Sequence, residues 1–322
     1  MANVAIVGAG AMGLAAAFHA LKAGHRVSVF EADKVAGGMA AHFDFDGLSI
    51  ERFFHFICKP DYPMFELMEE LGIADKLVWR ETSMGYFIDG KHYTWGDPWA
   101  LLTFPKLDPI SKFRYGLHMF LSTKRKDWSA LENVSSKEWF LRWQGKRAYE
   151  TLWRRLFELK FYEYADNVSA AWIWTRIKRV GVSRKSLFQE ELGYIDGGSE
   201  VLIEALVKAI VGAGGEIRLG AQVSEITCEN GRATGLVVDG VAHSFDAVVC
   251  TVPTPYVARI VPGLSAAARA QYEAIGNIGC VCVALKLAKP ITRHFWVNVN
   301  DRTIDIPGMV EFSNLRRLPD TV

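Results

Sequence analysis

A glycine-rich turn between an apolar run and a helix-forming segment constrains the fold of this chain more than any other feature. Val4-Ala5-Ile6-Val7 is apolar throughout, as expected for a strand buried on both faces. It leads directly into Gly8-Ala9-Gly10-Ala11-Met12-Gly13, and residues 14–22 then favour a helix that Gly24 ends. Because residues 26–30 favour a second strand, the N-terminal segment predicts a complete β-α-β unit.

Each glycine of this turn has a physical reason that points to a bound dinucleotide. Gly8 permits the tight turn, Gly10 lets the backbone approach a pyrophosphate at the positive end of the helix, and Gly13 lets helix and strand pack closely. Glu31 ends the second strand, where its carboxylate can accept hydrogen bonds from the adenosine ribose. A carboxylate there disfavours the ribose phosphate of NADP and leaves NAD and FAD open.

Four further motifs, in a fixed order along the chain, resemble those of one flavoprotein superfamily. Gly37-Gly38 follows Glu31, and Tyr194-Ile195-Asp196-Gly197-Gly198 precedes a predicted helix. Residues 215–226 and then 246–253 (Asp-Ala-Val-Val-Cys-Thr-Val-Pro) resemble the strands that follow in that superfamily. The set resembles the FAD-dependent amine oxidase, protoporphyrinogen oxidase and phytoene desaturase superfamily, which implies FAD as the cofactor.

The resemblance also implies which residues contact the cofactor. In that superfamily the second glycine pair lets the chain pass close to the flavin end, and Val223 matches the residue whose backbone meets adenine. The implied cofactor site consists of Gly8, Gly10, Ala11, Met12, Gly13, Glu31, Ala32, Gly37, Gly38, Met39 and Val223.

Two departures from the superfamily pattern bear on this site. Amine oxidases usually have Arg after the second glycine pair, where this chain has Met39, so one phosphate or flavin contact is missing or supplied elsewhere. The sequence also ends at Val322, without the superfamily's usual C-terminal segment. The expectation is therefore either a truncated chain or a short member with an open flavin site.

The order of the predicted elements indicates an α/β fold with a discontinuous organisation. We expect a Rossmann-like, glutathione-reductase-like FAD-binding domain formed by residues 1–59 and 190–256. Residues 60–189 and 257–322 form the expected substrate domain, which combines helices with antiparallel β-structure. Six tryptophans between residues 128 and 174 either pack within this helical region or line an apolar substrate pocket.

Local patterns predict several elements in detail. Hairpins are expected around Asp46-Gly47 and Asp89-Gly90, because such pairs favour two-residue turns. Ser135 has capping-box spacing, and Ser199 is predicted to cap the helix of residues 200–211. Period-2 alternation predicts a strand over residues 279–287.

His55 and Arg52, in Glu51-Arg52-Phe53-Phe54-His55, are the candidate catalytic residues. In the resembling flavoproteins and in UDP-galactopyranose mutases this segment passes near the flavin ring. His55 would exchange a proton with flavin or substrate, and Arg52 would bind an anionic group or stabilise reduced flavin. Alternatively, Arg52 pairs with Glu51 or another acid, and His55 is a satisfied interior histidine.

Other polar and sulfur side chains of the sequence favour structural roles. Lys286 is interpreted as an outward-facing strand lysine rather than a lysine near flavin. Cys280 and Cys282 are interpreted as small core residues rather than a redox pair. The five cysteines are widely spread and lack a CxxC pair, so neither a disulfide framework nor a zinc site is expected, and no metal is predicted.

Composition limits the partners of the chain. Thirty-seven basic and thirty-six acidic residues give a formal charge of +1, so nothing favours nucleic acid. The N-terminus lacks a signal-peptide pattern, and no segment approaches the roughly 18 to 20 apolar residues of a membrane span, so a cytoplasmic location is expected. The basic run Lys124-Arg125-Lys126, which is close to Trp128, leaves peripheral membrane contact open.

These observations predict a flavin-dependent oxidoreductase. It would transfer a hydride from a C–N or C–C bond of an apolar or aromatic small-molecule substrate to FAD. Two alternatives stay open: a flavin-dependent mutase acting on a nucleotide sugar, and a non-catalytic FAD-binding protein. The motifs identify neither the substrate, the electron acceptor nor the oligomeric state.

Overall fold

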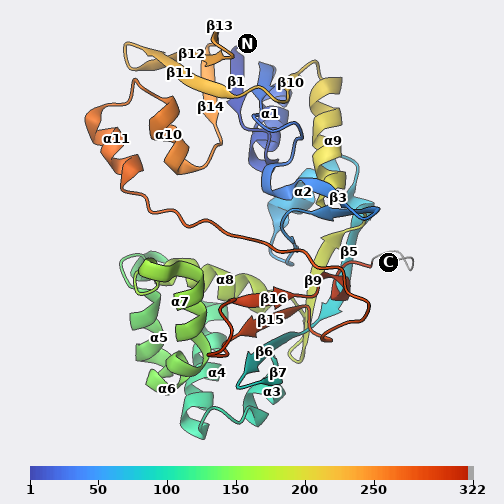
Figure 1. Cartoon of the computed structure of the whole chain (residues 1–322), viewed down its shortest axis with the longest axis vertical. Helices are drawn as coiled ribbons and strands as arrows, with labels where there is room; N and C mark the ends of the chain where they lie inside the picture. The colour runs from blue at the N-terminus through green and yellow to red at the C-terminus, as the bar shows by residue number, and fades with distance from the viewer. Residues whose placement is uncertain (318–322) are drawn as a thin grey trace. The chain divides into compact units, whose positions relative to one another are not determined.

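The computed structural model describes residues 1–317, and the chain divides into two compact units (Figure 1). The first unit contains residues 1–55, 65–77 and 195–284, and the second contains residues 56–64, 78–194 and the chain from 285 onward. Residues 65–77 and 257–284 thus lie in the first unit, although the sequence placed them with the substrate domain. Local contacts explain this assignment, because Glu70 of α2 forms a salt bridge with Lys22 of α1, and α10 packs against β11 and α11.

A four-stranded parallel sheet forms the centre of the first unit, with strand order β10-β2-β1-β14. Ile6 of β1 pairs with Val29 of β2 on one side and with Val249 of β14 on the other. Ala5 and Ile6 are fully buried, which agrees with the apolar run predicted as a doubly covered strand. Helices α1 and α9 pack against each other beside this sheet (Figure 1).

An antiparallel sheet of strands β11, β12 and β13 shares a core with the parallel sheet of the first unit. Val7 and Phe30 of the parallel sheet pack with Ile226 of β11 and Leu236 of β12. This packing fixes the start of β11 beside the ends of β1 and β2. The elements of the first unit are β1 (Asn3–Val7), α1 (Ala11–Lys22), β2 (Arg26–Phe30), β3 (His42–Phe45), β4 (Leu48–Glu51), α9 (Ser199–Gly212), β10 (Glu216–Arg218), β11 (Val223–Glu229), β12 (Arg232–Val238), β13 (Val241–Ser244), β14 (Ala247–Cys250), α10 (Thr254–Ile260) and α11 (Ala266–Glu273).

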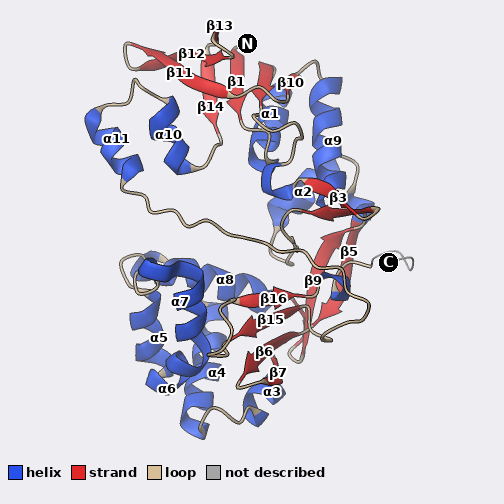
Figure 2. Ribbon diagram, in the orientation of Figure 1, coloured by secondary structure: helices blue, strands red, loops and turns tan. Residues whose placement is uncertain are grey.

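The second unit combines two sheets with a group of helices (Figure 2). One sheet has the order β16-β15-β6-β7, in which β15 runs parallel to β6, and the other has the order β5-β9-β8. Helix α2 (Tyr62–Glu70) begins in this unit and ends in the first. The other elements are β5 (Leu77–Thr82), β6 (Met84–Ile88), β7 (Lys91–Trp95), α3 (Pro98–Thr103), α4 (Pro109–Lys124), α5 (Ser136–Gln144), α6 (Lys146–Ala148), a π-helical turn (Tyr149–Arg154), α7 (Arg155–Phe161), α8 (Ala170–Val182), β8 (Arg184–Ser186), β9 (Gln189–Ile195), β15 (Trp296–Val299) and β16 (Gly308–Val310).

The short-range predictions agree with the structure where turn and cap residues carry the signal. Asp46 and Asp89 adopt positive φ angles of 55° and 50° at the predicted hairpin turns, between β3 and β4 and between β6 and β7. Ser135 caps α5, and its hydroxyl accepts a hydrogen bond from the Glu138 amide at 3.1 Å. The prediction of a mixed α/β fold is confirmed.

Two local predictions are wrong. Residues 279–287 form no strand, and Val281 and Val283 are 89 % and 73 % exposed, because alternation makes a strand only where a neighbouring strand supplies backbone hydrogen bonds. Cys280 and Cys282 are therefore exposed free thiols rather than core residues. Ser199 is the first residue of α9 rather than its cap, and its hydroxyl donates to the Ala40 carbonyl at 3.0 Å.

A buried histidine network holds the aromatic core of the second unit together. His118 of α4 is 2 % exposed, and its Nδ1 lies 2.9 Å from Gln144 Nε2. Gln144 Oε1 in turn accepts a hydrogen bond from Trp153 Nε1 at 2.8 Å. The His118 ring stacks on Trp143 and meets Trp139 edge-on. Burial lowers the pKa of His118 to about 4, so the ring is neutral at pH 7.

We predict that the second unit loses stability between pH 7 and pH 5 because of His118. In the unfolded chain this histidine titrates near 6.5, whereas its folded pKa is about 4. Below pH 6.5 the unfolded state therefore binds a proton at this histidine and the folded state does not. The free energy of unfolding falls by about 2 kcal/mol between pH 7 and 5 as a result. All ten tryptophans lie in the second unit, so urea unfolding followed by tryptophan fluorescence measures its stability.

The control for this prediction is His118→Asn, which removes the titrating group and keeps a polar side chain. The variant should be less stable at pH 7 but should lose less stability between pH 7 and 5 than the parent chain. An unchanged pH dependence in His118→Asn would show that other groups cause the effect.

Candidate cofactor site

The turn between β1 and α1 leaves no room for side chains at Gly8 and Gly13. Gly8 has a φ of 102°, which side-chain-bearing residues rarely adopt, and its amide donates to the Phe30 carbonyl at 2.8 Å. A Cβ on Gly13 would lie 1.9 Å from the Gly8 carbonyl oxygen. The first turn of α1 therefore lies directly against the end of β1, as the sequence motif implies.

The second glycine pair lies against the first. The Gly37 amide donates to the Ala9 carbonyl at 2.8 Å, and Gly10 and Gly37 form a bridge between the two segments. A Cβ on Gly38 would lie 3.1 Å from the Gly10 Cα. No side chain caps the N-terminus of α1, whose first amides therefore face the space beside this glycine contact without an intrahelical partner.

Glu31 connects the end of β2 with both neighbouring loops. Its Oε2 accepts a hydrogen bond from the Ala9 amide at 2.7 Å, and its Oε1 accepts one from the Asp33 amide at 2.9 Å. Each carboxylate oxygen has a second lone pair, so these two bonds orient the group and leave capacity for the ribose hydroxyls. The sequence-predicted ribose acceptor is thus held next to the glycine turn.

Two backbone hydrogen bonds hold the segment before Val223 in the same region. The Ala221 amide donates to the Glu31 carbonyl at 2.7 Å, and the Gly220 amide donates to the Asp33 carbonyl at 2.8 Å. The segment before β11 therefore lies along the loop that follows β2, and Val223 is the buried first residue of β11. The structure thus places Ala221, two residues before Val223, against Glu31, although the two segments are far apart in sequence.

The remaining predicted cofactor residues lie in the turns already described. Ala11 and Met12 are the first residues of α1, and the Met12 side chain is exposed. Ala32 follows Glu31, and Met39, also exposed, lies in the short 3-10 turn that begins at Gly38. The side chain that replaces the expected arginine thus adds no charge to this edge of the site.

Arg52, a candidate catalytic residue, is bound to an acidic residue of the cofactor loop. Its Nη1 lies 2.7 Å from Asp33 Oδ2, and this hydrogen bond lowers the pKa of the Asp33 carboxyl. The Arg52 amide donates to the Ala41 carbonyl at 2.9 Å. Arg52 therefore connects both ends of the segment that carries the second glycine pair. His55, the other candidate, is exposed in the loop after β4.

Thr251 and Glu51 are two supporting residues that the sequence reasoning missed. Thr251 follows β14, and its hydroxyl donates to the Val7 carbonyl at 2.9 Å, beneath Gly8. Glu51 is 4 % exposed at its side chain and accepts a hydrogen bond from the Ser199 amide at 2.9 Å, so it caps α9 in place of the predicted serine. The sequence offered little to find them by: Thr251 is a hydroxyl residue directly after an apolar strand, and Glu51 is an acid directly before Arg52.

A polar cavity of about 480 Å³ lies within the second unit. Glu190 is among its lining residues and is 5 % exposed, and its Oε1 accepts a hydrogen bond from the Thr82 hydroxyl at 2.8 Å. Burial raises the pKa of Glu190. Arg184 and Arg293 also line the cavity, which is therefore polar and charged rather than the apolar pocket considered for the tryptophans.

The residues of the first unit fit FAD. A Cβ on Gly10 would have only the Gly38 Cα within 4 Å, so the turn has room for an approaching diphosphate, and the uncapped α1 amides supply its donors. Among residues 1–317, no group of three or more His, Cys, Asp or Glu side chains is arranged to hold a metal ion. The same residues contain no helix long and apolar enough to cross a membrane.

Comparisons with known proteins point in the same direction. A family model described as flavin containing amine oxidoreductase matches residues 13–321. A 4,4'-diapophytoene desaturase of Staphylococcus haemolyticus is 27 % identical over 325 residues, which cover 90 % of this chain and 63 % of the desaturase. The chain therefore spans less than two thirds of that relative.

Two solved structures share the fold. A protein assigned as a protoporphyrinogen oxidase from Exiguobacterium sp. 255-15 gives a TM-score of 0.70 at 20 % identity, over 97 % of this chain and 73 % of that one. A reduced UDP-galactopyranose mutase gives 0.68 at 17 % identity, over 98 % of this chain and 71 % of that one.

We predict that Gly13→Ala abolishes FAD retention. Its methyl group would lie 1.9 Å from the Gly8 carbonyl oxygen, so α1 must move away from β1 and its amides leave the diphosphate position. The measurement is the FAD content of the purified variant. The matched control is Gly212→Ala at the end of α9, where a Cβ meets nothing within 4 Å, and this variant should keep the parent FAD content.

We predict that Glu31→Ala weakens FAD binding by about 1.5 to 3 kcal/mol, the cost of losing hydrogen bonds to a charged group. Titration of the apo-protein with FAD, followed by flavin fluorescence, measures the change. Glu31→Gln keeps one carbonyl acceptor and should lie between parent and Glu31→Ala. Equal affinities for all three proteins would exclude Glu31 as the ribose acceptor.

Proposed function

Because the chain belongs to the flavin-containing amine oxidoreductase family, we propose that it is an FAD-dependent oxidoreductase acting on an apolar small molecule. The observation that carries this proposal is the contact between the two glycine turns at the uncapped start of α1. The space beside Gly10, where a Cβ would have only the Gly38 Cα within 4 Å, would admit a diphosphate.

Each unit has a proposed role. The first unit, with its parallel sheet and glycine turns, would be the glutathione-reductase-like FAD-binding domain. The second unit would be the substrate domain, because it contains all ten tryptophans and most of the helical segment that the sequence assigned to that domain. The domain boundaries of this proposal are those of the two compact units.

The chain's own residues would bind and orient the cofactor. The amides of Ala11 and Met12 would donate to the diphosphate, and Glu31 would accept from the ribose. The Val223 backbone would meet adenine. Arg52, through Asp33, would position the second glycine pair, and Met39 leaves that edge without a further cation. Bound FAD would supply the hydride acceptor.

We favour a C–C bond over a C–N bond as the site of oxidation. Desaturation removes two hydrogens from neighbouring carbons, one as a hydride and one as a proton, so the substrate loses two electrons to the flavin. The relative named for desaturation supports this reaction class. The proton needs an acceptor, and His55, exposed after β4, is the proposed group. Oxygen or another acceptor would then reoxidise the flavin.

The mutase remains a second candidate because the fold matches a UDP-galactopyranose mutase over almost the whole chain. A mutase rearranges its sugar without a net change of oxidation state. The two candidates therefore differ in the fate of the electrons rather than in the cofactor site.

We predict that phytoene, presented in detergent micelles without oxygen, bleaches the yellow colour of the FAD-loaded protein, and that air restores it. Benzylamine, a probe of C–N oxidation, should bleach it more slowly. The measurement is flavin absorbance in the visible range under argon, with product analysis by mass.

The alternatives give different results in the same experiment. A mutase would leave the oxidised colour unchanged with UDP-galactose and would interconvert the sugar only after reduction with dithionite. A protein that only binds FAD would respond to none of these compounds, and that outcome would contradict the proposed activity.

A further inference from the structure

We infer that the exposed face of helices α3 and α4 is a docking surface for an anionic lipid bilayer. This inference goes beyond the proposed redox function, since it concerns a partner rather than a reaction. It differs from the sequence expectation, which considered only the basic run at residues 124–126 and Trp128.

Helix α4 has its polar side inward and its apolar side outward. Ile110, Phe113 and Phe120 are 72 %, 70 % and 58 % exposed, and they recur at helical spacing along one stripe with Leu117. A surface helix of a globular protein normally buries such a stripe. The exposed stripe is therefore a feature that packing within the second unit does not explain.

The opposite side of α4 shows why the helix cannot simply turn over. Ser111, His118 and Ser122 are buried there, and each makes a hydrogen bond. The Ser111 hydroxyl donates to Asp108 Oδ2 at 2.7 Å, the Ser122 hydroxyl donates to the His118 carbonyl at 2.7 Å, and His118 contacts Gln144. The two serine bonds lie within α4 and its cap, whereas the His118–Gln144 contact joins α4 to α5, so rotation of the helix would break that contact and leave Gln144 with a buried unpaired amide.

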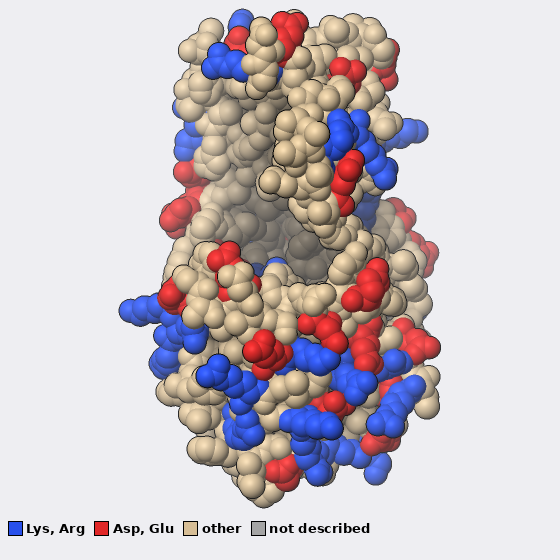
Figure 3. Space-filling view, turned by 90° about the vertical axis from the view of Figure 1, so that its left-hand side faces the viewer, with Lys and Arg blue, Asp and Glu red and all other residues tan. Residues whose placement is uncertain are grey.

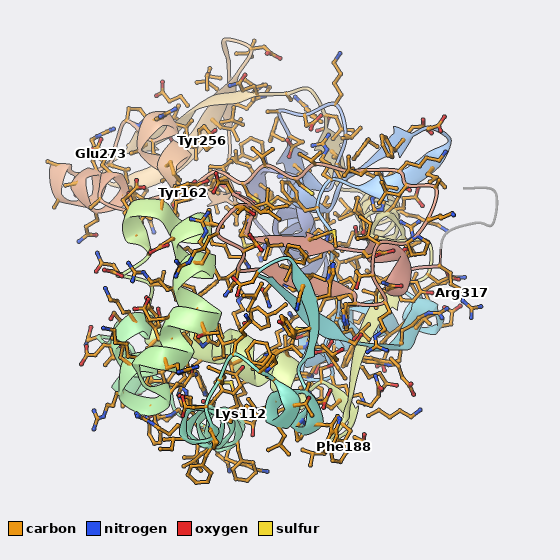
Figure 4. All side chains as sticks on the ribbon, turned by 60° about the horizontal axis from the view of Figure 1, so that its bottom comes forward. Lys112, Tyr162, Phe188, Tyr256, Glu273 and Arg317 are labelled. Carbon is orange, nitrogen blue, oxygen red and sulfur yellow. The ribbon has the colours of Figure 1, made fainter. Side chains whose placement is uncertain are left out.

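Helix α3 extends the apolar stripe. Trp99 and Leu102, three residues apart, are both exposed on α3. The two helices contact each other, and Lys112 Nζ donates to the Leu102 carbonyl across the junction at 2.6 Å. Figure 4, in which Lys112 is labelled on α4, brings this end of the second unit forward. We call the six residues Trp99, Leu102, Ile110, Phe113, Leu117 and Phe120 the α3–α4 apolar face.

Basic residues outnumber acidic ones around the α3–α4 apolar face. Between residues 97 and 127 the chain has six basic residues and three acidic ones, of which Asp97 and Asp108 cap α3 and α4. Among residues 1–317, no acidic side chain forms a salt bridge with Lys112, Lys124 or Lys126. Elsewhere, Figure 3 shows cationic and anionic side chains interspersed on the face it presents.

Lys124 Nζ lies 5.5 Å from the centre of the Phe120 ring, and apolar side chains with cations beside them match a bilayer better than a second copy of the chain. In an interface between two identical faces, the basic rims would meet each other and repel. Anionic headgroups attract the same rim, while tryptophan, phenylalanine, leucine and isoleucine enter the boundary of the acyl chains. The surface thus has both components that interfacial helices use.

We predict that the full, FAD-loaded chain sediments with vesicles of phosphatidylglycerol and phosphatidylcholine, and binds much less to phosphatidylcholine alone. Phe113→Ser/Phe120→Ser should reduce the partition coefficient about tenfold, because it removes two large apolar contacts. Lys124→Gln/Lys126→Gln should weaken binding to the anionic vesicles and flatten its salt dependence.

The matched control is Val211→Ser/Val241→Ser, which removes two exposed apolar side chains of the first unit and should bind like the parent. Thermal unfolding and FAD content should be unchanged in all variants, because the replaced side chains are exposed. Parent-like binding by Phe113→Ser/Phe120→Ser would overturn the inference. So would a concentration-dependent dimer, seen by sedimentation, that only this variant disrupts, or failure of the parent to bind any vesicle.

Discussion

The hydrogen bond from the Ala9 amide to Glu31 is the interaction on which the candidate site depends. It joins the glycine turn after β1 to the end of β2, and the second oxygen of the same carboxylate holds the Asp33 amide. Arg52 then binds Asp33, so one chain of contacts runs from the turn to the second glycine pair. The site is thereby arranged by protein contacts before a cofactor contributes any binding energy.

The sequence predicted those parts of the site whose geometry is local. Gly8, Gly13 and Glu31 act within one β-α-β unit, and the turn chemistry of Asp46 and Asp89 is equally local. The pattern is informative because a tight turn or a close contact permits few residue types. Such positions can be recognised without knowing which other segments approach them.

Contacts between distant segments could not be predicted in this way. Glu51 replaces Ser199 as the cap of α9, and nothing near Ser199 in sequence signals a carboxylate that lies 148 residues away. Thr251 supports the turn at Gly8 through a comparably distant contact. The strand expected over residues 279–287 does not form. Its alternating pattern is local, but a strand also needs a neighbouring strand, which the pattern does not specify.

The orientation of helix α4, with its apolar stripe outward, connects the packing of the second unit with the proposed contact with a bilayer. The His118 network requires the polar side of α4 to face the aromatic core, so the apolar stripe must face outward. The same packing that stabilises the core therefore creates the α3–α4 apolar face. The apolar small molecule proposed as substrate would partition into a bilayer rather than into water, so such a surface would bring the enzyme to it. Lipid docking and substrate supply would then depend on the same buried histidine.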